Sequence, residues 1–168
     1  MVSYVVNRSS ISVTLAANGN PVGTSIAIST GSFETGTSSA GVQGAGNSTL
    51  VLSNLNQNTS YTVKSRAVSF TNLASSQTVV ATTTTLTTGV TVTGYKIYTT
   101  SVSVSLGANG NPDGTQVVVS TGSNNHFAVS LASIGRISGS ETTLTIFGLS
   151  TNTAYGLQAG SVDGGGST

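Results

Sequence analysis

The sequence has no cysteine and no tryptophan, only two prolines and a single histidine. The lack of cysteine excludes disulfides, thiolate nucleophiles and cysteine-ligated zinc. Charged residues make up 5% of the 168 residues, against about a quarter in typical soluble proteins. Because the net charge is only +1, we expect no nucleic-acid partner, which would need a basic patch. No apolar run approaches the ~20 residues that a membrane span requires.

The polar part of the chain is dominated by hydroxyl side chains, because Ser and Thr make up about a third of its residues. The remainder includes 36% hydrophobic residues, and Val, Ile and Leu alternate with polar residues along much of the chain. This alternation is typical of half-buried β-strands, and Thr suits a pleated surface. A surface with so few charges opposes contact between copies only weakly, which favours self-association.

The residue types that carry catalysis are sparse and scattered. The single histidine, His126, has no carboxylate near it in sequence, whereas a catalytic triad needs a base held by a third group. The four acidic residues lie far apart in the sequence: Glu34, Asp113, Glu141 and Asp163. We therefore expect that the protein is not an enzyme and that it uses no cofactor and no metal.

The strongest feature of the sequence is an internal repeat. The segment YVVNRSSISVTLAANGNPVGTSIAISTGS begins at Tyr4, and its match YKIYTTSVSVSLGANGNPDGTQVVVSTGS begins at Tyr95, about 91 residues later. A second pair is LVLSNLNQNTSYTV from Leu50 and LTIFGLSTNTAYGL from Leu144, about 94 residues apart. Two copies of this length predict two domains, at residues 1–88 and 89–168.

Each copy contains four segments that alternate with the period of a strand. We expect these strands at 10–16, 24–30, 49–55 and 59–68 in the first copy, and at 101–107, 115–121, 143–149 and 153–162 in the second. No helical period with caps is present. Short strands separated by Gly, Pro and Asn predict an all-β fold of two consecutive sandwiches.

The loop GANGNPDGT resembles the first half of a calcium loop, because Asn109, Asn111 and Asp113 alternate before a glycine. In the first copy, however, Val22 stands where Asp113 stands in the second. We therefore interpret the loop as a turn in which glycine takes a left-handed conformation before the next strand. The predicted turn residues are Asn18, Asn20, Pro21, Gly23, Asn109, Asn111, Pro112 and Gly114.

The segments LNQNTSY and LSTNTAY resemble the L-x-x-x-T-x-Y tyrosine corner of fibronectin type III domains, in their bacterial or archaeal extracellular form. The resemblance covers almost the whole chain and implies two immunoglobulin-like sandwiches, in which each corner tyrosine bonds upstream backbone. The tryptophan usual in the second strand of the family is absent, and Leu15 and Leu106 take its place. The corner residues would be Leu55, Thr59, Tyr61, Leu149, Thr153 and Tyr155.

The second copy ends before the last strand of the fold. QTVVATTTT at 77–85 is the expected last strand of the first sandwich, and no stretch after Val162 corresponds to it. Three explanations stay open: the sequence is part of a longer array, another subunit donates a strand, or six strands suffice. The candidate donor is the N-terminal segment of a neighbour, with Val2, Tyr4, Val5 and Val6.

These features favour a structural subunit of an extracellular filament, surface layer or stalk, which assembles by strand-edge contacts. Its partners would be copies of itself, head to tail, or neighbouring domains of a longer chain. The alternative is a spacer, or an adhesion or carbohydrate-associated module, from a larger secreted protein. Tyr95, Lys96 and Tyr98 could form a small sugar-stacking face, but an ordinary first strand is the favoured interpretation. We expect an extracellular or cell-surface location.

Overall fold

A computed structural model of the chain describes residues 3–122 and 131–163. These residues form β-strands and loops, and none of them forms a helix. The described part of the chain therefore contains no helix that could cross a bilayer. This agrees with a sequence that alternates apolar and polar residues and has no helical period.

The chain divides into two compact units, Met1–Leu86 and Thr87–Thr168. The strands of the first unit are β1 (Ser3–Val6), β2 (Ile11–Leu15), β3 (Ser25–Thr30), β4 (Ser38–Val42), β5 (Ser48–Leu52), β6 (Ser60–Val68) and β7 (Thr78–Thr84). Those of the second unit are β8 (Thr91–Ile97), β9 (Ser101–Gly107), β10 (Gln116–Ser120), β11 (Ala132–Arg136), β12 (Glu141–Phe147) and β13 (Gln158–Val162).

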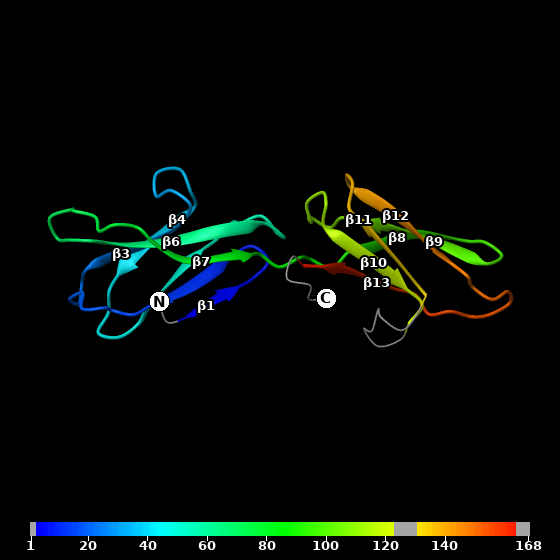
Figure 1. Cartoon of the computed structure of the whole chain (residues 1–168), viewed down its shortest axis with the longest axis horizontal. Coiled ribbons are helices and arrows are strands. Elements are labelled where there is room, and N and C mark those ends of the chain that lie inside the picture. The colour runs from blue at the N-terminus through cyan, green and yellow to red at the C-terminus, as the bar shows by residue number, and fades with distance from the viewer. Residues whose placement is uncertain (1–2, 123–130, 164–168) are drawn as a thin grey trace. The chain divides into compact units, whose positions relative to one another are not determined.

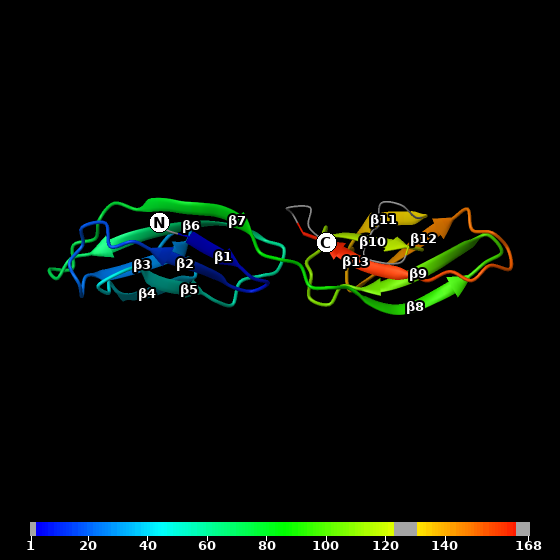
Figure 2. The ribbon, with the colours of Figure 1, turned by 90° about the horizontal axis from the view of Figure 1, so that it is seen from below.

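Each unit has two antiparallel sheets (Figure 1). In the first unit the sheets have the orders β1-β2-β5 and β4-β3-β6-β7, with β7 next to β6 in Figure 2. In the second unit the orders are β12-β9-β8 and β11-β10-β13. The predicted all-β fold is confirmed. Among the described residues, no strand pairs with the outer edge of β13, where the sequence predicted that a last strand is missing.

The two units share the same strand registers. Ile11 of β2 pairs with Leu52 of β5, and the corresponding Val102 of β9 pairs with Ile146 of β12. The central strands β3 and β10 likewise pair with β6 and β13 in one register. Because a slip of one residue would turn every apolar side chain to the wrong face, the alternating sequence fixes this pairing.

Each unit has its own apolar core between its two sheets. Strand β2 shows the alternation directly, because Ile11, Val13 and Leu15 are buried and the residues between them are half-buried. Strand β9 repeats the pattern with Val102, Val104 and Leu106. Leu15 and Leu106 are thus buried where the family resemblance placed the usual tryptophan.

Two strands were not expected from the sequence. β4 and β11 have the sequences SSAGV and ASIGR, whose apolar residues are too few to mark a strand. Both contain a glycine over a core leucine: a Cβ on Gly41 would lie 2.8 Å from Leu50 Cδ2, and a Cβ on Gly135 would collide with Leu144. These glycines let the leucine pack directly beneath the strand backbone.

The strand expected at 153–162 was predicted too long. It begins at Gln158, whereas its counterpart β6 begins at Ser60, the equivalent of Ala154. In the first unit, β7 supplies the hydrogen-bond ladder along this part of β6. Without such a ladder, residues 154–157 of the second unit do not form a strand.

The boundary between the units falls two residues before the predicted one. The Ser161 hydroxyl donates to the Thr88 carbonyl oxygen at 2.8 Å. The Thr88 amide donates to Asn111 Oδ1, also at 2.8 Å. These contacts tie the entering segment to the second unit, although 1–88 was predicted as the first domain.

Candidate functional site: an open strand edge

The two NGNP loops are turns with the same geometry. Gly23 and Gly114 have φ angles of 89° and 86°, in the left-handed region that glycine adopts readily. The amides of Asn20 and Asn111 donate to the carbonyls of Ala17 and Ala108, at 2.9 and 3.0 Å. Turn hydrogen bonds thus fix both loops, with Pro21 and Pro112 inside them.

The residue that makes the second loop resemble a calcium site has a structural contact. Asp113 Oδ1 accepts a hydrogen bond from the Gly139 amide at 2.8 Å. No group of three or more His, Asp or Glu residues occurs among the described residues. A calcium ion needs six to eight oxygen ligands, whereas this loop offers one carboxylate, which already accepts a hydrogen bond from the Gly139 amide.

The other polar candidates are not gathered in one place. Glu141 accepts a hydrogen bond from the Thr93 hydroxyl. Glu34 lies in the loop between β3 and β4, and Asp163 directly follows β13. His126 lies outside the described residues.

Both tyrosine corners contain the same hydrogen bond. The Tyr61 hydroxyl accepts from the Asn56 amide at 2.9 Å, and the Tyr155 hydroxyl accepts from the Ser150 amide at 2.9 Å. Leu55 packs in the first core, and Leu149 packs against the second. The hydroxyls of Thr59 and Thr153 each bond the carbonyl two residues earlier in the loop.

In the first unit, β7 closes the sandwich beside this corner. Its Val80 packs against the apolar core. Just beyond the strand, the fully buried Thr85 hydroxyl donates to the Asn56 carbonyl at 2.6 Å and accepts from the Thr59 amide at 3.0 Å. The strand therefore contributes both an apolar side chain and a hydroxyl that completes the corner.

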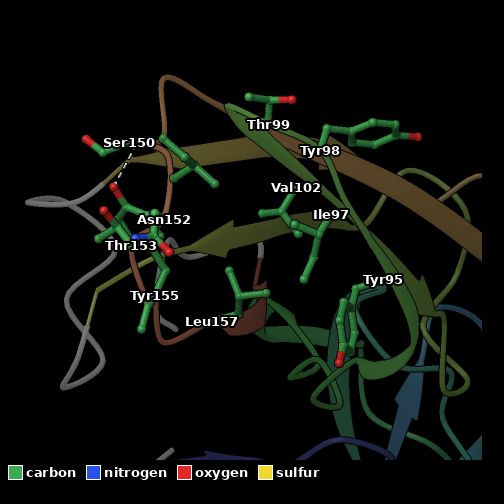
Figure 3. A pocket seen from close by; sticks show the side chains of 12 residues that line it. Tyr95, Ile97, Tyr98, Thr99, Val102, Ser150, Asn152, Thr153, Tyr155 and Leu157 are labelled. Atoms are coloured by element: carbon green, nitrogen blue, oxygen red, sulfur yellow. Dashed lines mark hydrogen bonds between the residues drawn. The ribbon is translucent and has the colours of Figure 1, made fainter.

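In the second unit, the corresponding place is a groove of about 750 Å³ (Figure 3). Ile97 of β8 and Val102 of β9 lie opposite Leu157 in this view. None of the residues that line the groove is charged. Its apolar and aromatic lining residues are Tyr95, Ile97, Tyr98, Val102, Leu149, Ala154, Tyr155 and Leu157, and its polar ones are Thr99, Ser150, Asn152 and Thr153.

Side chains at equivalent positions of the two units differ in exposure, and the difference shows which surface β7 covers in the first unit. Val63 of the first unit is 0% exposed, whereas its counterpart Leu157 is 40% exposed. Val6 packs against the first core, whereas its counterpart Ile97 is 74% exposed. Tyr155 is 36% exposed and lines the groove. The apolar groove is therefore the surface that a last strand would bury.

Only one end of the β13 edge is covered. There, the Ser161 hydroxyl bonds the Thr88 carbonyl and the Thr87 hydroxyl, at 2.8 and 3.0 Å. From Ala154 to Gly160, no other strand lies along the outer edge within the described residues. An edge of this kind can pair with an added strand.

The predicted assembly segment is already paired within its own unit. Tyr4, Val5 and Val6 belong to β1 and pair with Val13, Ser12 and Ile11 of β2. Val2 lies outside the described residues. Donation of this segment to a neighbour would cost the first unit its first strand.

No family model matches the sequence, and no curated protein matches it. Among solved structures, the chain is similar to a two-domain fibronectin type III segment from chicken tenascin, with a TM-score of 0.54, 17% identity, and coverage of 96% of this chain and 89% of that one. A chitinase from Bacillus thuringiensis gives a TM-score of 0.34 at 17% identity, over 94% of this chain and 28% of the chitinase. The tenascin likeness confirms the predicted fibronectin type III-like fold.

Part of the groove was predictable from the sequence. Tyr95 and Tyr98 drew attention as a possible stacking face, and both line the groove, 67% and 52% exposed. Ile97 and Leu157 were not singled out, because each continues an ordinary alternating pattern. The missing last strand was the available clue to their exposure.

Proposed function

We propose that the chain is a non-catalytic structural module of an extracellular or cell-surface protein, and that it assembles by strand addition at the outer edge of β13. One observation carries this proposal: among the described residues no strand pairs with the outer edge of β13, which runs beside an uncharged, partly apolar groove. An added strand would gain backbone hydrogen bonds from the edge and apolar burial from the groove.

The composition supports assembly with further copies. A chain with 5% charged residues and a net charge of +1 has little electrostatic repulsion between molecules. The contact would join an edge of one copy to a different segment of the next, so it would be heterologous. Contacts of that kind build filaments when they do not close into a ring.

The test is the assembly state of the purified chain, followed by negative-stain electron microscopy and sedimentation over a range of concentrations. We expect filaments or concentration-dependent oligomers. Ile97→Asp, in the groove, should weaken assembly. Ile134→Asp is the matched control, because Ile134 is also exposed, at 64%, but does not line the groove.

A chain that stays monomeric at all concentrations would contradict self-assembly and would support the alternative of a spacer within a larger secreted protein. Assembly that survives Ile97→Asp but fails with Ile134→Asp would place the contact on the β11 edge instead.

A further inference from the structure

The first unit has a surface equivalent to the groove, and in that unit β7 covers it. The first unit has the same registers, the same tyrosine corner and the same first strand, with β7 seated between them. The described residues of the second unit contain each of these parts except the strand. The β7 segment therefore shows which chemistry the groove accepts.

We infer that the groove binds one uncharged, extended strand, antiparallel to β13, with the side-chain pattern of β7. This inference rests on the proposed function and names the occupant that strand addition requires. No lining residue is charged, so a charged strand would lose its hydration without gaining a partner.

The pairing of β6 with β7 sets the register. Tyr61 pairs with Thr83, Val63 pairs with Ala81, and the ladder shifts between Val63 and Lys64. Transferred to the second unit, Tyr155 would face the position of Thr83, and Leu157 the position of Ala81. The residue at the position of Val80 would then lie in the groove near Ile97 and Leu157.

The hydroxyl at the position of Thr85 gives the strand a second anchor. In the first unit, Thr85 bonds the Asn56 carbonyl and the Thr59 amide. Their counterparts are Ser150 and Thr153, and both line the groove. The described residues contain no equivalent bond to the Thr153 amide. A threonine there would supply both a donor and an acceptor.

The chain also shows what the bound state would change. Residues 154–157 do not form a strand, although their counterparts in β6 do when β7 is present. Binding would extend β13 toward the tyrosine corner. The amides of Tyr155 and Leu157 would become protected from hydrogen exchange as the ladder forms.

The test uses a labelled peptide with the sequence of residues 77–87, QTVVATTTTLT, added to the full chain. We expect saturable binding and protection of the Tyr155 and Leu157 amides. A peptide with Val80→Asp should bind at least about tenfold more weakly, because a carboxylate would enter the apolar groove. Thr85→Val should cost about tenfold, because it keeps the shape and removes the hydroxyl.

Protein variants separate the groove from other surfaces. Ile97→Asp should weaken peptide binding at least about tenfold, whereas Ile134→Asp should leave it unchanged. Binding that ignores Ile97→Asp would overturn the inference, because the peptide would then be exchanging with β7 or using another edge. Binding of cellohexaose at Tyr95 and Tyr98, with no binding of the peptide, would also overturn it.

A second form of the experiment removes the cost of bringing two molecules together: residues 77–87 are appended after Thr168. We expect a higher unfolding temperature of the second unit and protection of Tyr155. Absence of protection with both free and appended peptide would overturn the inference. Peptide binding by a chain that never assembles would support this inference and contradict the proposed self-assembly. Assembly of a chain that does not bind the peptide would support the proposed self-assembly and contradict this inference.

Discussion

The two units are built from one pattern, and they differ at the last strand. In the first unit β7 covers the edge of β6, Val80 enters the core and Thr85 completes the tyrosine corner. In the second unit the same surfaces form an open groove. The comparison shows that the corner and the central pairing form without the last strand, whereas the strand at residues 154–157 does not.

The units also differ in the segment that enters them. Asn111 of the second unit is 5% exposed, and its side-chain amide donates to the carbonyls of Thr88 and Ala108, at 2.6 and 2.9 Å. Its Oδ1 accepts from the Thr88 amide. Asn20 is the counterpart of Asn111 in the first unit, and its side chain makes no hydrogen bond among the described residues. The NGNP turn of the second unit therefore also binds the segment at Thr88 that enters this unit, whereas the turn of the first unit has no such contact among the described residues.

The largest difference is expected for an acidic residue beneath the last strand. Val63→Asp would bury a carboxylate without a partner and should destabilise the first unit by more than about 4 kcal/mol. Leu157→Asp, at the equivalent position, should cost about 1 kcal/mol or less, because that side chain is already exposed. Hydrogen exchange resolved by unit measures both. Equal losses would mean that β7 does not protect Val63.

The two turn asparagines should differ next. Asn111→Ala removes three hydrogen bonds of a buried amide and should cost the second unit about 2–3 kcal/mol. Asn20→Ala should change the stability of the first unit by about 0.5 kcal/mol or less. Thermal unfolding monitored on amides of each unit is the measurement. A similar loss in both units would show that the turn, not the entering segment, is what Asn111 stabilises.

The turn glycines should behave alike. Gly23→Ala and Gly114→Ala place a Cβ at a positive φ, which costs about 1–2 kcal/mol. Space around them is open: the nearest atom to a Cβ on Gly23 is Phe70 Cζ at 3.8 Å, and Gly114 has none within 4 Å. Chemical denaturation of each variant should give matching losses. Unequal losses would contradict an identical turn in the two copies.

The smallest effects are expected at the corner hydroxyls. Tyr61→Phe should cost the first unit about 1 kcal/mol, because the Asn56 amide loses its acceptor. Tyr155→Phe should cost less, because water reaches the more exposed corner of the second unit. The appended strand of residues 77–87 should bring the two losses together, as read from denaturation of the paired variants. A larger loss at Tyr155 than at Tyr61 would contradict this order.

Most strands and turns of the fold were predictable from alternation and turn motifs in the sequence. Alternation in SISVTLA and SVSVSLG predicted β2 and β9, and the NGNP turns and L-x-x-x-T-x-Y segments predicted the connections. β4 and β11 were missed, because their residues pair through the backbone and bury few side chains. The predicted length of β13 was wrong. Pairing with a neighbouring strand decides where a strand begins, and no residue of β13 itself encodes that neighbour.

Period-two patterning and the repeat are local properties of the chain, so the sequence by itself determined two sandwiches, the second without a counterpart of β7 among these 168 residues. Only the tertiary structure decided which side chains that absence uncovers. Ile97, Tyr155 and Leu157 come from segments far apart in the sequence and meet only when the two sheets pack. Their exposure depends on whether a strand lies over them, which is a property of the assembled fold and not of any single segment.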